Sequence, residues 1–122
     1  MASGDDRLVE LLEELVAWTR FASRTALIGL LDAEVKDAKH LLAFELSDGT
    51  RSQKQVGDLV GLSQPSVSLL WKRWRRLGIA RDVGGRARHI ARPTDIGMER
   101  AQQLVTATPK VKKAMEAGSA DG

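Results

Sequence analysis

The sequence predicts a mainly α-helical protein with one small β-hairpin, and three observations support this fold class. Apolar residues recur at helical spacing through most of the 122 residues. Serine or threonine stands before several of these stretches, in the position that caps a helix. After residue 78 the period changes to that of strands, around the turn-forming pair Gly84-Gly85. The length is typical of a single compact domain.

The first expected element is a long helix within residues 1–31. Asp5 and Asp6 stand in its first turns, where the helix dipole favours acids. Alternating steps of four and three place apolar and small residues in one seam: Leu8, Leu12, Leu15, Thr19, Ala22 and Ala26. Because further apolar residues lie off this seam, one small domain offers the helix too few partners. We expect the seam to pair two copies of the chain. The alternative is a helix packed only on its own core.

Residues 32–105 are expected to form a second unit that begins with two helices. The first of them is predicted over Asp32–Glu45. Ser52 and Gln55 then match a capping box, which opens a short helix over Gln53–Val60.

A longer helix is expected from its cap at Ser63 to Leu77. Pro65 falls in the first turn, where a missing N–H costs nothing, and Gly78 stops the helix. A helical wheel places five apolar residues on one side, as a buried stripe: Val67, Leu70, Trp71, Trp74 and Leu77. We therefore interpret the two tryptophans as core residues.

Two short strands, Ile79–Val83 and Arg86–Arg92, are expected to form a hairpin around the two glycines. Thr94 is then predicted to cap a last helix, from about Asp95 to about Val105. Residues 106–122 turn basic and then small, which indicates either a frayed helix or a disordered tail.

A short helix, a three-residue turn, a longer capped helix and a glycine-tipped hairpin, in this order, predict a winged helix-turn-helix. The side of the longer helix opposite the tryptophans carries small residues at its start and cations further along. Small side chains let a helix end approach base edges in the major groove, while cations meet phosphates. The predicted base contacts are Gln64, Pro65, Ser66, Ser68 and Leu69. The predicted backbone contacts are Lys72, Arg73 and Arg76, joined by Ser52 and Lys54 from the preceding helix.

The charges are unevenly distributed along the chain, whose net charge is +3. Residues 1–50 carry five bases and ten acids, whereas residues 51–122 carry fourteen bases and six acids. This imbalance favours a polyanionic partner for the second part. Arg86 and Arg88 lie two apart in the hairpin, hence on one side of a strand, from which they are expected to enter a minor groove. The alternative is a solvated basic surface without a partner.

One set of residues carries a family resemblance. The run Gly61-Leu62-Ser63-Gln64-Pro65-Ser66-Val67-Ser68, then Leu77-Gly78-Ile79, the Gly-Gly hairpin and Thr94-Asp95-Ile96-Gly97, resembles MarR-type transcriptional regulators over about residues 32–105. The resemblance implies a homodimer, operator DNA as the partner, a recognition helix at Ser63–Leu77 and a minor-groove wing at Arg86 and Arg88. Such regulators usually have a long C-terminal dimerisation helix, whereas 17 residues follow Val105 here, so pairing is expected to depend mainly on the N-terminal helix. Gly85-Arg86 also replaces the family's Asp-Arg pair in the wing.

The composition excludes several other classes of protein. The absence of cysteine rules out disulfides, thiolate nucleophiles and cysteine-ligated zinc. Neither His40 nor His89 has metal-ligand spacing around it, although His89 in the hairpin is a candidate phosphate contact. No stretch approaches the roughly 20 apolar residues of a membrane span, and no secretory signal is visible at the start. We expect a cytoplasmic protein without enzymatic activity, cofactor or metal.

The expected function is sequence-specific binding of double-stranded DNA by a dimeric transcriptional regulator, acting as a repressor rather than an activator. One alternative is an architectural protein, chromatin-like or for plasmid maintenance, that coats DNA with little sequence preference. Another is a winged-helix module that docks a second protein. The sequence indicates no particular small-molecule effector.

Overall fold

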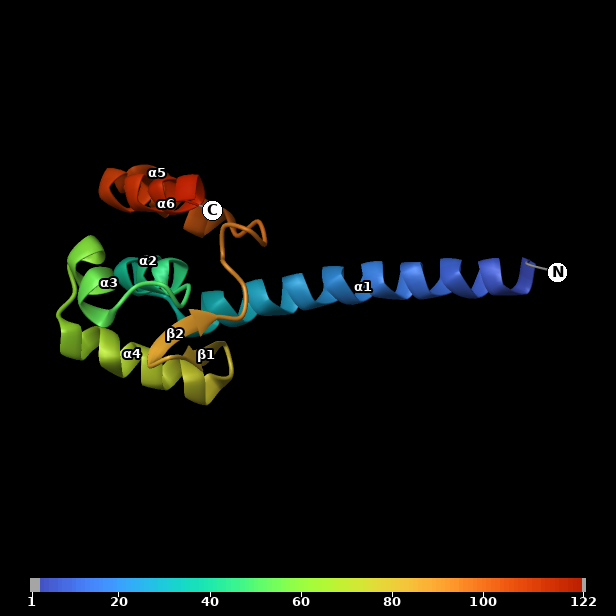
Figure 1. Cartoon of the computed structure of the whole chain (residues 1–122), viewed down its shortest axis with the longest axis horizontal. Coiled ribbons are helices and arrows are strands. Elements are labelled where there is room, and N and C mark those ends of the chain that lie inside the picture. The colour runs from blue at the N-terminus through green and yellow to red at the C-terminus, as the bar shows by residue number, and fades with distance from the viewer. Residues whose placement is uncertain (1–2, 122) are drawn as a thin grey trace. The chain divides into compact units, whose positions relative to one another are not determined.

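The computed structural model describes residues 3–121, with side-chain exposure for residues 4–117. Within this range the chain forms six helices and one two-stranded antiparallel sheet (Figure 1), which confirms the mainly helical fold class with a small hairpin. The chain divides into two compact units, residues 1–34 and 35–122. None of the described helices is long and apolar enough to cross a membrane.

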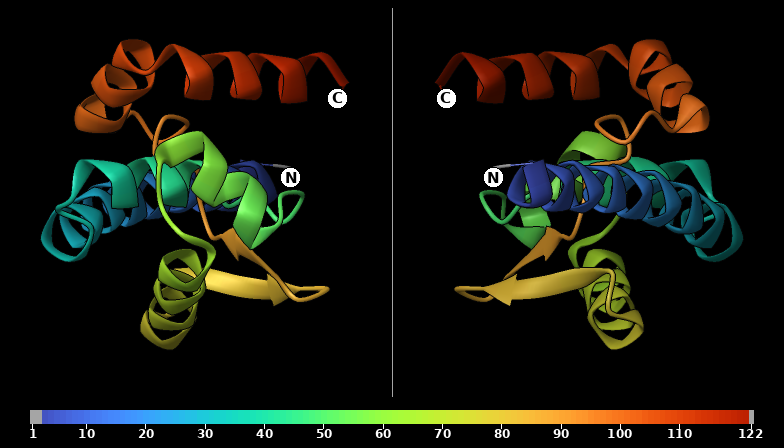
Figure 2. Two further views of the ribbon diagram at one scale, coloured as in Figure 1. Left: turned by 90° about the vertical axis from the view of Figure 1, so that its left-hand side faces the viewer. Right: turned by 90° about the vertical axis from the view of Figure 1, so that its right-hand side faces the viewer.

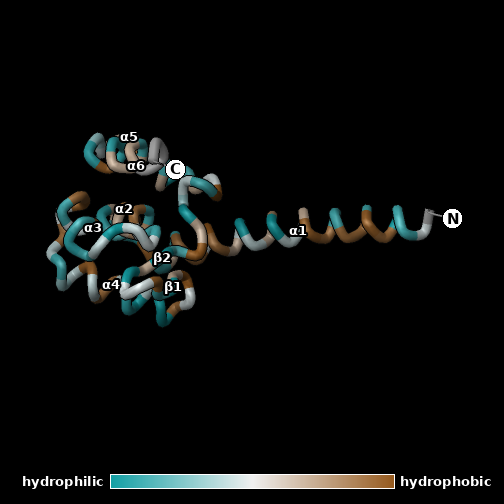
Figure 3. The backbone as a smooth tube through the Cα atoms, viewed as in Figure 1, coloured by the Kyte–Doolittle hydropathy of each residue, from teal (hydrophilic) through white to brown (hydrophobic). Residues whose placement is uncertain are grey.

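The first unit is a single helix, α1 (Ser3–Glu34). It runs past the predicted end at residue 31, so it includes Asp32, which was predicted to begin the next helix. The hydroxyl of Thr19 donates to the Leu15 carbonyl oxygen at 2.8 Å, which satisfies this polar group within the helix. Hydrophobic residues recur along α1 in Figure 3, and most of the large ones are exposed.

The second helix, α2 (Ala38–Leu46), begins later than the predicted Asp32 because Asp37 caps it. The Asp37 carboxylate accepts from the backbone N–H of Lys39 at 2.9 Å and of His40 at 3.1 Å. The bond from His40 is the main reason that the pKa of Asp37 lies below its usual value. A start at Asp32 was therefore wrong, since α1 takes residues 32–34 and a capped helix begins only at Ala38.

The predicted bounds of the next two helices are confirmed. The helix α3 (Gln53–Val60) opens with the Ser52–Gln55 capping box and ends at Gly61, whose φ of 77° is left-handed. The helix α4 (Gln64–Leu77) is capped by the Ser63 hydroxyl and ends at Gly78, also left-handed. Local capping chemistry thus defines both ends of both helices.

The hairpin consists of β1 (Ala80–Val83) and β2 (Arg86–His89), which are both shorter than predicted. The other edge of β2 is also paired. His89 N donates to Ser47 O at 2.8 Å, and Gly49 N donates to Ala87 O at 3.1 Å. The segment after α2 therefore pairs with the outer edge of β2 through an isolated antiparallel bridge between Asp48 and Arg88.

The end of the chain differs most from prediction. Thr94 caps no helix: residues 93–97 form turns, and α5 (Glu99–Ala107) begins after Met98 without a side-chain cap. Of the two alternatives for the tail, the structure has a helix, α6 (Pro109–Asp121). Arg51, in the loop before α3, donates to the Ala114 carbonyl oxygen at 3.1 Å, and Lys110 donates to the Asp58 carbonyl oxygen of α3 at 2.8 Å. These bonds hold the start and middle of α6 against the unit.

In the second unit α2 and α3 form a middle layer. Both views of Figure 2 place α5 and α6 on one side of this layer, and α4 with the hairpin on the other. The buried apolar residues of the unit come from every element: Val35, Leu41, Leu42, Ala43, Phe44, Leu46, Val56, Val60, Val67, Trp71, Trp74, Ile79, Ala80, Ala87, Met98, Ala101, Val105 and Val111.

Gly57 allows α3 to pack tightly against the turn before α4. A Cβ atom built at this position would lie 2.4 Å from the Leu62 carbonyl oxygen. The backbone N–H groups of Gly61 and Leu62 both donate to the Gly57 carbonyl oxygen, at 2.8 and 2.9 Å. The turn therefore lies too close to α3 for any side chain at residue 57.

Replacing Gly57 with alanine should destabilise the second unit, although alanine favours helices. We expect a loss of about 1–3 kcal/mol in the free energy of unfolding, because the backbone of the turn must move. Urea denaturation followed by tryptophan fluorescence measures this loss. The neighbouring exposed substitution Asp58→Ala is the control and should change stability by less than about 0.5 kcal/mol. Equal, small changes in the free energy of unfolding for Gly57→Ala and Asp58→Ala would contradict the close approach of the turn to α3.

Candidate nucleic-acid interface

The rotation of α4 about its axis is fixed by two buried tryptophans. Trp71 and Trp74 are each 1% exposed. The Trp71 indole N–H donates to the Ser47 hydroxyl at 2.9 Å, and this hydroxyl donates to the Ala43 carbonyl oxygen at 2.7 Å. The Trp74 ring meets Phe44 edge to face, with ring centroids 5.0 Å apart. The prediction that both tryptophans are core residues is confirmed.

The predicted stripe is narrower than the helical wheel indicated. Val67 is buried with the tryptophans, Leu70 is half-buried, and Leu77 is 40% exposed. Leu77 was therefore wrongly assigned to the core, because α4 ends there and Gly78 turns the chain away.

The opposite side of α4 is exposed and carries most of the predicted DNA contacts. Ser66 and Ser68 are half-buried, and the Ser66 hydroxyl is 2.8 Å from that of Ser63. On α3, Lys54 is exposed, while the half-buried Ser52 is engaged in its capping box. The exposed members on α4 are Gln64, Pro65, Leu69, Lys72, Arg73 and Arg76.

The two predicted wing arginines lie on the outer side of β2. Ala87 between them is buried, whereas Arg86 and Arg88 are exposed. The Arg86 guanidinium donates to the Thr50 carbonyl oxygen at 2.6 Å, so its position is defined by the loop after α2. The aliphatic stem of Arg88 lies over Gly49.

Arg75 connects α4 to the hairpin, and sequence reasoning missed this role. Its guanidinium pairs with the Asp82 carboxylate at 3.1 Å and donates to the Gly85 carbonyl oxygen at 3.4 Å. It also lies 5.9 Å from the Trp71 ring centroid, within cation–π range. The sequence feature that could have indicated this ion pair is Asp82, the single acid among eight bases in residues 71–92.

Behind the hairpin, a buried carboxylate holds the segment that follows β2. Glu45 is 1% exposed and accepts from the Thr94 N–H at 2.8 Å and the Thr94 hydroxyl at 3.0 Å. Arg92 Nε lies 3.3 Å from the same carboxylate. Burial raises the pKa of Glu45, although Thr94 and Arg92 oppose this shift. These contacts between residues distant in sequence explain why Thr94 caps no helix.

The His89 ring packs into this cluster. It lies against Phe44 with ring centroids 5.7 Å apart, and Nε2 is 3.2 Å from the Glu45 carbonyl oxygen. Burial lowers the pKa of His89, which favours the neutral ring. The other histidine, His40, is half-buried on α2. Among the described residues, no three histidines or acids gather in a way that could hold a metal ion.

The residues of the predicted seam are all exposed on α1. They are Leu8, Leu12, Leu15, Thr19, Ala22 and Ala26. Leu8, Leu12 and Leu15 are each more than half exposed. Trp18 and Phe21, outside the seam, contact each other edge to face and are exposed at 69% and 59%. The helix thus has a long apolar surface available for a partner.

The geometry suits the binding of a polyanion by α4 and the hairpin together. The cations come from two adjacent elements, and the Arg75 contacts hold these elements to each other. The comparisons with known proteins found no matching family model and no significant similarity to a curated protein or a solved structure.

Asp48 provides a test of the contacts around the hairpin. Burial would raise its pKa, but hydrogen bonds from Thr50 and the charges of Arg51 and Arg92 outweigh burial and lower it below 3.8. A lowered carboxyl pKa contributes stability that is present above the unfolded-state pKa and lost as the pH falls through the folded-state pKa. Asp48→Asn should therefore cost about 1–2 kcal/mol at pH 7, from lost charge-assisted hydrogen bonds.

The stability difference between wild type and Asp48→Asn should shrink as the pH falls below 3.8, the ordinary aspartate value. Denaturation curves at a series of pH values measure it. The exposed Asp58→Asn removes the same charge from α3 and should cost less than about 0.5 kcal/mol at pH 7. A loss for Asp48→Asn that is independent of pH would contradict the assigned cause of the pKa shift.

Proposed function

We propose that this chain is a winged helix-turn-helix protein that binds double-stranded DNA sequence-specifically and represses transcription as a dimer. In this proposal α3 and α4 are the helix-turn-helix, and β1 and β2 are the wing. The observation that carries it is the face of α4 opposite the two buried tryptophans. This face combines the exposed Gln64, Pro65 and Leu69 in the first two turns with exposed cations further along.

Base recognition is assigned to the first two turns of α4. Gln64 and Pro65 stand at its start, and Gln64 has an amide that can pair with an adenine edge. Leu69, 67% exposed, suits contact with a thymine methyl group. Ser66 and Ser68 are less exposed, which supports a secondary role for their hydroxyls.

Phosphate binding is assigned to the cations around this surface. Lys72, Arg73 and Arg76 are exposed in the second part of α4, and Lys54 is exposed near the start of α3. Such contacts set the position of a protein on the duplex without reading its sequence. The wing contacts with the minor groove are assigned to Arg86, whose guanidinium donates to the Thr50 carbonyl oxygen, and to the exposed Arg88.

Dimerisation is assigned to α1. Two copies of its seam would bury large apolar side chains that the single chain leaves exposed. A two-fold dimer also matches the symmetry of a palindromic operator, with half-sites about 10 base pairs apart.

The phosphate-binding role is tested by the double substitution Lys72→Ala with Arg76→Ala. We expect weaker binding to operator and to random duplex alike, because phosphate contacts do not depend on sequence. The slope of log K against log salt should become less negative by about 0.9 for each lost contact. Fluorescence anisotropy at several salt concentrations measures both quantities, with an operator obtained by selection from random duplexes.

The matched control is Lys112→Ala with Lys113→Ala, which removes the same charge from exposed positions of α6. It should leave affinity and slope nearly unchanged. Equal effects of the two double substitutions would contradict the assignment to α4. A ratio of operator to random affinity below about tenfold would indicate an architectural protein, against the 10³ or more of regulators.

The pairing role of α1 is tested by Leu15→Glu, which puts a charge into the seam. We expect the wild type at twice the chain mass of 13.3 kDa and the variant at or near the single-chain mass. Light scattering coupled to size exclusion measures both. Phe21→Glu, about 140° around the helix from Leu8, makes the same kind of change outside the seam and should leave the dimer intact. A wild type of 13.3 kDa, or dissociation by Phe21→Glu alone, would contradict pairing through the seam.

A further inference from the structure

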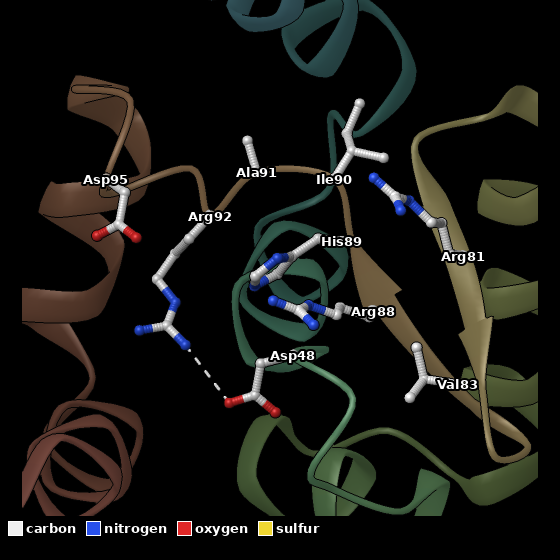
Figure 4. Close-up of a pocket in the computed structure, with 9 residues that line it drawn as sticks. All are labelled: Asp48, Arg81, Val83, Arg88, His89, Ile90, Ala91, Arg92 and Asp95. Atoms are coloured by element: carbon white, nitrogen blue, oxygen red, sulfur yellow. Dashed lines mark hydrogen bonds and ion pairs between the residues drawn. The ribbon is translucent and has the colours of Figure 1, made fainter. Parts of the chain in front are cut away.

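A hollow of about 580 Å³ lies between the hairpin and the segment that leads to α5. Figure 4 shows its lining, which includes three arginines and two aspartates. The residues that line it are Asp48, Arg81, Val83, Arg88, His89, Ile90, Ala91, Arg92 and Asp95. The charged members decide what the hollow can bind.

Two of these charged residues neutralise each other. Arg92 pairs with Glu45 at 3.3 Å and with Asp48 at 3.4 Å. The Asp48 carboxylate also accepts from Thr50 and pairs with Arg51 at 2.9 Å. The charges of Asp48 and Arg92 are therefore largely balanced within the protein and attract a charged ligand only weakly.

The side chains of Arg81 and Arg88, unlike those of Asp48 and Arg92, have no hydrogen bond or ion pair within the described part of the chain, although both backbones are paired in the hairpin. They are direct partners in the register of the hairpin, so their side chains leave the sheet on the same side. In Figure 4 both guanidinium groups point into the hollow, and Asp95 lies beyond Arg92, at the other end. Two like charges directly opposite each other destabilise a sheet unless an anion lies between them.

The backbone under Arg88 is well defined. The hydrogen bonds from Gly49 to Ala87 and from His89 to Ser47 hold both sides of this residue. A Cβ atom at residue 49 would lie 3.3 Å from the Arg88 Cβ, so Gly49 leaves room for the arginine stem. The backbone that carries Arg88 is thus positioned before a ligand arrives, which lowers part of the entropic cost of binding.

We propose that the Arg81–Arg88 pair binds a phosphate group in this hollow. Guanidinium groups match the oxygen atoms of phosphate in pairs of parallel hydrogen bonds, and two arginines supply the charge for a dianion. The phosphate has two possible sources, the backbone of bound DNA or a free phosphate ion. The site rests on the proposed function where DNA supplies the phosphate, since Arg88 is also an expected wing contact, and it adds Arg81 and the hollow to that wing.

The first arm of the experiment uses no DNA. Inorganic phosphate replaces chloride at constant ionic strength while the arginine Nε–Hε signals of the full chain are followed by NMR. We expect saturable shifts of the Arg81 and Arg88 signals, and at least about tenfold weaker binding in Arg81→Gln and in Arg88→Gln. Lys113→Gln, an equal change of charge on α6, should bind phosphate like the wild type.

The second arm distinguishes the two sources. If DNA supplies the phosphate, a duplex shifts the Arg81 and Arg88 signals and prevents free phosphate from shifting them. In that case the double variant Arg81→Gln with Arg88→Gln binds DNA with a slope of log K against log salt that is less negative by about 0.9. If the ligand is a free ion, phosphate still shifts both signals in the DNA complex, and the slope is unchanged. Non-saturable shifts that are equal in wild type, both variants and Lys113→Gln, with an unchanged slope, would overturn the proposal. Because the first arm contains no DNA, a failure of DNA binding is distinguishable from a failure of the phosphate site.

Discussion

The burial of two indole rings under α4 is the constraint on which the rest of the site depends. Trp71 reaches the Ser47 hydroxyl, and Trp74 meets the edge of Phe44, so both contacts attach α4 to α2 and the segment that follows it. Burying two such rings contributes several kcal/mol, far more than any exposed ion pair in this region. Once these rings are inside, the helical period places Lys72 and Arg76 outside.

The position of the hairpin beside α4 follows from weaker but directional contacts. Arg75 and Asp82 are 30% and 61% exposed, so their ion pair contributes less than about 1 kcal/mol to stability. Its effect is to orient β1 relative to α4, together with the bond to Gly85. Burial therefore determines which side of α4 faces outward, and polar contacts determine which cations lie beside it.

The parts of the fold that sequence reasoning predicted are those determined by neighbouring residues. The caps at Ser52 and Ser63 and the left-handed glycines define α3 and α4 within a few positions along the chain. The predictions of local structure were wrong where a residue bonds to a partner distant in sequence instead of to its neighbours. Thr94 looked like a helix cap, but it donates to Glu45, 49 residues away in sequence. The pairing of β2 with residues 47–49, which buries His89 and positions Arg88, has no local pattern that reveals it.

The most direct test of the account is a map of the backbone amide signals of the full chain during titration with a DNA duplex. The account predicts that the signals that move belong to the start of α3, to α4 from Gln64 to Arg76, and to the hairpin from Val83 to Arg88. It predicts that residues 99–117 remain unchanged. A map in which α4 and the hairpin stay still while α5 and α6 respond, or in which no signal moves at low salt, would contradict the assignment of the nucleic-acid interface.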